Sequence, residues 1–144
     1  MVNGFTAERA EVAEKFRMSI NQLSEKVIGL CIEIHRNLGP GLLESAYEEC
    51  LCYELSKAGI PFERQKPVTV KYKEVNLDCG FRIDVLVDQQ LIVELKSVEK
   101  VLPIHEAQII TYLKITDMRV GLLINFNSIT LINGLKRFVN NFNE

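Results

Sequence analysis

The stretch that decides the fold reads Phe81-Arg82-Ile83-Asp84-Val85-Leu86-Val87-Asp88-Gln89-Gln90-Leu91-Ile92-Val93-Glu94-Leu95-Lys96. Apolar residues recur at every second position on both sides of a short polar turn, a pattern that predicts two β-strands joined as a hairpin. A three-residue loop places Val87 opposite Leu91, and the same register places Asp84 opposite Glu94. The hairpin is therefore expected to bring two carboxylates together.

The two faces of this hairpin differ in character. The odd-numbered positions are all apolar, which predicts that their face lies in the core. That face consists of Phe81, Ile83, Val85, Val87, Leu91, Val93 and Leu95. The even-numbered face holds charges beside two apolar residues, which indicate that it is partly covered as well. Its members are Arg82, Asp84, Leu86, Ile92, Glu94 and Lys96.

Two carboxylates in directly opposite positions are costly. At ~5 Å and an effective dielectric constant of ~20 they repel by about 3 kcal/mol, and like charges in a cross-strand pair destabilise a sheet. Protonation of one carboxyl, a cation between the two, or a neighbouring base such as Lys96 relieves this repulsion. Mg²⁺ or Mn²⁺ satisfies the arrangement best, because these ions prefer oxygen ligands, and such sites activate water and bind phosphate. From spacing alone, an exposed sheet face with solvated charges explains the pair equally well.

The rest of the chain predicts an α/β fold with a central mixed β-sheet flanked by helices. Helical periodicity that ends at glycine or proline, and short apolar runs, mark the elements. We expect helices over about 24–38, 42–57, 104–115 and 135–141, and further strands over about 68–72 and 119–125. The buried stripe of the second helix is expected to be Leu43, Ala46, Tyr47, Cys50, Leu51 and Leu55.

The length and charge of the chain narrow the function. Its 144 residues fit one domain, which we place at residues 22–144 after an N-terminal helical extension of residues 1–21. The formal net charge of −2 excludes a strongly basic protein, so nucleic-acid binding requires a local basic patch. Basic residues gather around the first strand at Arg64, Lys66, Lys71 and Lys73.

The ends and the cysteines point to a cytoplasmic protein that does not contact membranes. The chain has no apolar run of about eighteen residues, and its N-terminus lacks the apolar stretch of a signal peptide. Its cysteines are expected to be reduced core thiols rather than metal ligands. They are Cys31, Cys50, Cys52 and Cys79. His35 and His105 are expected to be structural, near helix ends.

The spacing of the hairpin charges matches a known signature. Asp84, followed ten residues later by Glu94-Leu95-Lys96, resembles the motif of the PD-(D/E)xK nuclease superfamily. This resemblance implies a restriction-endonuclease-like fold in which Asp84, Glu94 and the backbone carbonyl of Leu95 bind a metal ion and Lys96 positions the attacking water. Ile83 stands where the superfamily usually has proline, a departure that the superfamily tolerates.

Two further strings extend the resemblance. Gln108 and Tyr112 match the Q-x3-Y pattern of RecB-type nucleases, and their spacing puts both on one helical face. The string Gly41-Leu42-Leu43-Glu44-Ser45-Ala46-Tyr47, preceded by Ile34-His35-Arg36-Asn37-Leu38-Gly39, matches G-x-x-E-x-x-Y. Over about residues 22–142 the chain resembles the GxxExxY protein family, a small bacterial group in this superfamily.

The family resemblance adds three residues to the expected site. It implies that Glu44 is a further catalytic acid that binds metal directly or through water, and that Gln108 and Tyr112 shape the site or contact the nucleic acid. Taken from the residues alone, Glu44 also fits a first-turn glutamate that the helix dipole favours. Likewise, Gln108 and Tyr112 alone also fit a core tyrosine beside a solvated glutamine.

Our main hypothesis is a Mg²⁺- or Mn²⁺-dependent nuclease that hydrolyses phosphodiester bonds of DNA or RNA, with DNA favoured. The alternative is a catalytically inactive nuclease fold that serves as a binding or interaction module, which the small size and near-neutral charge favour. A third hypothesis is a homodimer that acts with other proteins.

Overall fold

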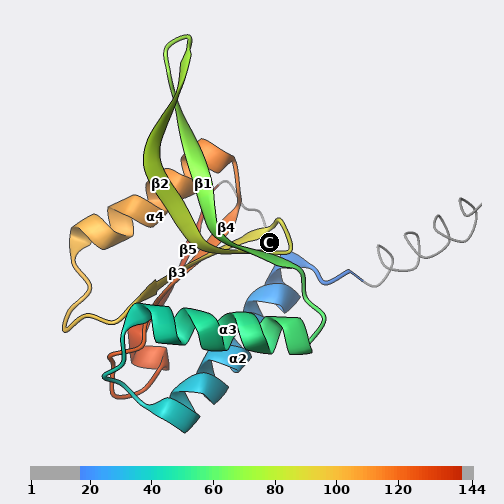
Figure 1. The fold of residues 1–144 in the computed structure, drawn as a ribbon, viewed down its shortest axis with the longest axis vertical. Helices are drawn as coiled ribbons and strands as arrows, with labels where there is room; N and C mark the ends of the chain where they lie inside the picture. Colours follow the sequence, from blue (N-terminus) through green and yellow to red (C-terminus); the bar gives the residue numbers. More distant parts are fainter. Residues whose placement is uncertain (1–16, 141–144) are drawn as a thin grey trace, which may run out of the picture.

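The computed structural model describes residues 17–140, which form a five-stranded mixed β-sheet between helices (Figure 1). The predicted α/β fold is confirmed. The helices of this range are α2 (Ile20–Leu38), α3 (Glu44–Lys57) and α4 (Pro103–Thr116). The strands are β1 (Phe62–Tyr72), β2 (Val75–Val87), β3 (Leu91–Lys96), β4 (Val120–Asn125) and β5 (Leu135–Val139), with the short 3-10 helix η1 (Ile132–Gly134) before β5. Residues 1–16 of the expected extension lie outside the described residues.

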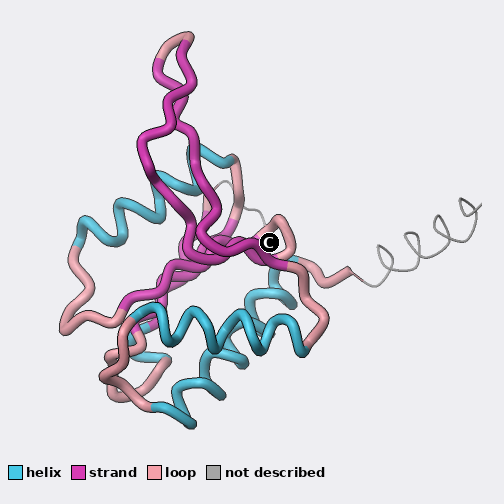
Figure 2. Tube along the Cα trace, viewed as in Figure 1, coloured by secondary structure: helices cyan, strands magenta, loops and turns pink. Residues whose placement is uncertain are grey.

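The sheet has the strand order β1-β2-β3-β4-β5. Only β3 and β4 run parallel, and α4 makes the crossover between them, while the other neighbours are antiparallel. Figure 2 shows the strands passing between α2 and α3 on one side and α4 on the other. Strand β3, which carries the Glu94-Leu95-Lys96 string, therefore lies in the centre of the sheet.

Both faces of the sheet are buried by helices. Helices α2 and α3 cover the face that includes Val85 and Val93. Helix α4 covers the opposite face, where its Ile109 packs in one cluster with Leu86 and Ile92. The even-numbered face of the β2–β3 hairpin is therefore covered, as its apolar residues indicated. The charged residues of that face lie beside the apolar cluster beneath α4.

Helix α2 has clear start and stop signals. Ser19 and Gln22 form a capping box, in which each side chain accepts a hydrogen bond from the backbone of the other. Gly39 ends the helix with a φ of 68°, a left-handed conformation that glycine adopts without strain. The residues buried between these ends are Leu23, Ser24, Val27, Cys31 and Ile34. Helix α2 thereby provides a fixed base for α3.

The tyrosine of the G-x-x-E-x-x-Y string is structural. The buried Tyr47 ring stacks on Phe126 with centroids 4.2 Å apart. Its hydroxyl donates to the Gly39 carbonyl at 2.6 Å and accepts from the Leu42 backbone N–H at 3.1 Å. The Leu42 carbonyl in turn accepts from the Ser97 hydroxyl, directly after β3. These bonds fix the start of α3 against the end of β3.

The predicted C-terminal helix over 135–141 is wrong. Leu135–Val139 forms strand β5, which pairs antiparallel with β4 from Val120–Val139 to Ile124–Leu135. The three-residue spacing of Leu135 and Phe138 suits a helix, but the segment is short and lies along a free strand edge. Tertiary pairing therefore overrides local preference here.

Three expected core positions are also wrong. Leu43 is the exposed residue that precedes α3, and Phe81 and Cys79 are exposed on β2. Beyond the sheet, β1 and β2 continue as a projecting hairpin arm, residues 69–80 (Figure 1). Cys79 lies on this arm, and Phe81 lies at its base, where it pairs with Val68. The register of the two strands shifts between Val68 and Thr69, where a bulge bends the arm away from the sheet.

The remaining cysteines lie inside the helical layer or at its edge. Cys31 and Cys52 are buried, and burial raises the pKa of their thiols to about 12 and about 11. Cys50 is half-buried. Within residues 17–140, no helix has both the length and the apolar character needed to cross a membrane.

Candidate active site

Asp84 and Glu94 lie where β2 and β3 separate. Regular pairing of these strands runs from Val87–Leu91 to Val85–Val93, which confirms the predicted register. Beyond that pair, the Asp84 backbone N–H donates to Glu94 Oε1 at 3.1 Å, and the Leu95 backbone N–H donates to Asp84 Oδ2 at 2.9 Å. Each carboxylate therefore accepts a hydrogen bond from the opposite strand, and the two side chains close the fork between the strands.

The carboxylate pair is buried rather than solvated. Glu94 is only 4% exposed and Asp84 is half-buried, so an exposed face with solvated charges does not describe this site. Burial, followed by the charge of Asp84, raises the pKa of Glu94 to about 8. Burial also raises the pKa of Asp84, against the opposing effect of the Leu95 N–H. Without a cation, Glu94 is therefore largely protonated at neutral pH.

Lys96 and Tyr112 lie around this pair. Lys96 is half-buried at the end of β3, and its charge lowers the pKa values of both carboxyl groups. Tyr112 is buried on α4, and its pKa is raised first by burial and then by the charge of Glu94. Gln108 Nε2 donates to the Tyr112 hydroxyl at 3.0 Å. Gln108 thus joins the site through Tyr112.

Helix α3 presents a buried acidic residue, Glu48, to the hairpin strands. Glu44 is exposed in the first turn of α3, the position that the helix dipole favours. Glu48 follows one turn later on the same side of the helix and is only 8% exposed. Sequence reasoning missed Glu48, although its spacing of four from Glu44 and its place beside the buried Tyr47 were visible signals.

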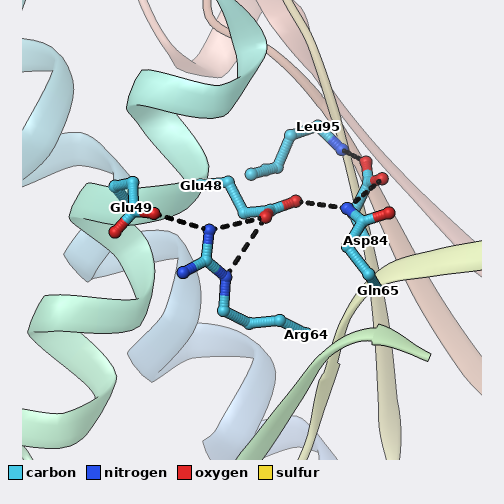
Figure 3. A network of polar contacts seen from close by, with 6 residues as sticks. All are labelled: Glu48, Glu49, Arg64, Gln65, Asp84 and Leu95. Atoms are coloured by element: carbon cyan, nitrogen blue, oxygen red, sulfur yellow. Dashed lines mark hydrogen bonds and ion pairs between the residues drawn. The ribbon is translucent and has the colours of Figure 1, made fainter.

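Glu48 is linked to Asp84 through a second side chain (Figure 3). Gln65 Nε2 donates to Glu48 Oε1 at 2.7 Å and lies 3.4 Å from Asp84 Oδ1. The other oxygen of Glu48 accepts from Arg64 Nη2 at 2.8 Å, and the same nitrogen reaches Glu49 Oε1 at 2.9 Å. Arg64, one of the basic residues around β1, is therefore engaged by acidic residues of α3.

The carboxyl groups of the site provide part of the ligand set of a divalent ion. Within residues 17–140, no three His, Cys, Asp or Glu side chains form a ready-made metal-binding group. Mg²⁺, however, keeps several waters and is commonly held by one or two carboxylates together with substrate phosphates. Asp84 and Glu94 supply two carboxyl groups, and their raised pKa values show that the empty site disfavours their charged forms, which a bound cation would stabilise. The pair fits an ion that the substrate helps to bind.

The two glutamates of α3 are expected to respond differently to replacement. Glu48→Gln should weaken Mn²⁺ binding about tenfold, because residues next to metal ligands commonly contribute that much to affinity. Glu44→Gln should leave the affinity unchanged, since Glu44 is exposed and no hydrogen bond links it to Asp84 or Glu94. Calorimetric titration of both variants compares them directly. A larger loss of Mn²⁺ affinity in Glu44→Gln than in Glu48→Gln would indicate that Glu44, the acid of the family motif, is the residue of α3 that contributes to the ion site.

The two histidines have structural partners. His35 Nε2 lies 2.9 Å from the Ser128 carbonyl, and His105 Nδ1 accepts from the Leu102 backbone N–H at 3.0 Å, at the start of α4. Both contacts agree with the structural role predicted for these histidines.

The fold and the site together define a nuclease-type α/β domain, with Asp84 at a strand fork and Glu94-Leu95-Lys96 on the neighbouring central strand. Comparison with protein families agrees with this class. Residues 21–138 match the PD-(D/E)XK nuclease superfamily, and the chain belongs to that superfamily. Neither a curated protein nor a solved structure matched the chain.

Proposed function

We propose that this chain is a Mg²⁺- or Mn²⁺-dependent nuclease that hydrolyses phosphodiester bonds of DNA in preference to RNA. The observation that carries the proposal is the buried Asp84–Glu94 pair at the strand fork, with Lys96 on the same strand as Glu94. The narrower assignment to the GxxExxY family is part of the proposal and is supported by the Gly41–Tyr47 string.

Each site residue has a distinct role in this proposal. Asp84, Glu94 and the carbonyl of Leu95 would hold the ion, with Glu48 rather than Glu44 as the additional acid from α3. When bound, such an ion polarises a phosphoryl oxygen and lowers the pKa of a bound water. Lys96 orients the attacking water through its Nζ, and its positive charge compensates the negative charge that develops on the phosphate.

The wall beside α4 and the hairpin arm provide contacts for the nucleic acid. Tyr112 and Gln108 form the α4 wall of the site. On and below the arm, Lys71, Lys73 and Arg82 are exposed and form no ion pair with any described residue. These three cations supply the local positive charge that a chain with a net charge of −2 needs to approach phosphates.

The proposal is tested by cleavage of end-labelled single- and double-stranded DNA and RNA. We expect the wild-type protein to cut DNA in Mg²⁺ or Mn²⁺ and to stop when a chelator is added. The calorimetric titration with Mn²⁺ accompanies the assay, because it does not depend on the choice of substrate. A wild-type protein that neither binds Mn²⁺ nor cuts any of the four substrates would contradict the proposal.

The hairpin arm favours the alternative of an interaction module. Tyr72 is paired with Val75, and Val70 with Leu77, so these four residues share one face of the arm. Tyr72, Val75 and Leu77 are exposed, and a protein partner or a second copy of the chain would cover such an apolar face. Self-association without ion-dependent cleavage would favour this alternative over the nuclease.

A further inference from the structure

Gln65 has an unusual backbone conformation for a residue within a strand. Its neighbours Arg64 and Lys66 pair with Val85 and Ile83, so Gln65 lies opposite Asp84, but it takes no part in the regular pairing. Its φ is 49°, in the left-handed region that residues other than glycine adopt only with strain. Strained residues of this kind persist where surrounding contacts hold them, and they cluster at functional sites.

The contacts of its side chain account for this conformation. Turned out of the ladder, Gln65 directs its amide between two acidic residues from different elements, Glu48 of α3 and Asp84 of β2 (Figure 3). Because Asp84 Oδ2 is already held by the Leu95 N–H, the amide at Oδ1 fixes the second oxygen of the same carboxylate. Arg64 likewise holds the second oxygen of Glu48. Gln65 is therefore the only link among these contacts between the α3 acid and the hairpin acid.

We propose that Gln65 is a positioning residue, which holds the Glu48 and Asp84 carboxylates in one arrangement ready for a divalent ion. The inference rests on the proposed function, because it assigns Gln65 a part in the ion site described above. A side chain that orients metal ligands through hydrogen bonds commonly contributes ten- to a hundredfold to ion affinity. In this chain the two hydrogen bonds of the Gln65 amide require a strained backbone conformation at the same residue.

Replacement of Gln65 with glycine distinguishes the contribution of the side-chain amide from that of the strained backbone. Gln65→Gly relieves the positive φ, because glycine adopts it freely, and removes both hydrogen bonds. The metal-free thermal midpoint should stay at or above that of the wild type, while Mn²⁺ affinity should fall about ten- to a hundredfold. Gln65→Leu, which removes the amide but keeps the side-chain bulk, should show the same loss of affinity. A purely structural residue would change the thermal midpoint without changing the affinity.

Gln89 offers a matched control. It also has a positive φ, of 55°, and its Nε2 donates to a carboxylate, Glu63 Oε2, at 3.0 Å, but it lies in the turn between β2 and β3. Gln89→Gly should therefore leave Mn²⁺ affinity at the wild-type value. Calorimetric titration and thermal denaturation of Gln65→Gly, Gln65→Leu and Gln89→Gly, each beside the wild type, complete the experiment.

The outcomes separate this inference from the proposed function. If the wild type binds Mn²⁺ and both Gln65 variants bind it equally well, Gln65 is not a positioning residue, while the ion site stands. Tighter binding in Gln65→Gly would also overturn the inference, because the amide would then compete with the ion for the carboxylates. If the wild type binds no Mn²⁺, the inference fails, and the proposed function fails with it if the wild type also cuts none of the four nucleic acids.

Discussion

Replacement of Asp84 with asparagine is expected to lower ion-dependent cleavage by about a thousandfold or more, which corresponds to roughly 4 kcal/mol of transition-state stabilisation. Asparagine keeps the shape of Asp84 and one acceptor for the Leu95 N–H, but it removes the negative charge that would hold the ion. Mn²⁺ binding should be lost together with cleavage. Initial rates of DNA cleavage and calorimetric titration of the same preparation measure the two effects.

The Asp84→Asn protein is expected to remain folded. Burial raises the pKa of Asp84 in the metal-free protein, so the charged carboxylate is less favourable at this position than in the unfolded chain, and a neutral asparagine avoids that cost. Its thermal midpoint in the presence of a chelator should therefore equal or exceed that of the wild type. Full cleavage activity in this variant would show that Asp84 is not part of the catalytic site. Loss of activity together with a lowered thermal midpoint would indicate general damage to the fold.

The hairpin part of the site was predictable because it depends on local geometry. The period of two in the strand fixes which residues share a face, and the short turn fixes the register. Val87–Leu91 and Val85–Val93 pair as expected, and Asp84 and Glu94 follow at the next positions. The sequence does not show that these carboxylates hydrogen-bond to the opposite backbone, because that arrangement arises only where the strands separate.

The features of the site and fold that the sequence did not predict depend on tertiary contacts. Glu48 lies one helical turn after Glu44, and only the docking of α3 through Tyr47 brings it to Gln65 beside the hairpin. Gln65 joins the site through a left-handed backbone within a strand, which no sequence pattern indicates for glutamine. The exposed Phe81 lies at the base of the arm, beside the register shift after Val68.

Replacement of Glu94 with glutamine is expected to stabilise the metal-free protein at pH 8. The same replacement should abolish the stabilisation of the protein by Mn²⁺. The pKa of Glu94 is about 8 in the folded protein, against an ordinary value of 4.5. Between these values the folded state keeps a proton that the unfolded state has lost. Stability from this group is therefore full below about pH 4.5 and is lost as pH rises through about 8. Glutamine has no proton to lose, so the variant should avoid this decline.

The difference between the two proteins should widen with pH and reach the order of a few kcal/mol at pH 8. Urea denaturation at pH 5, 6.5 and 8 in the presence of a chelator measures it, and Glu25→Gln on the exposed side of α2 controls for the loss of a carboxylate elsewhere. Parallel stability profiles for the wild type and Glu94→Gln would contradict the raised pKa. Addition of Mn²⁺ at pH 8 should then stabilise the wild type, because ligand binding favours the native state, and leave Glu94→Gln unchanged. A buried carboxylate that destabilises the empty fold and is rescued by the ion is explained by ion binding, since packing alone would favour the glutamine.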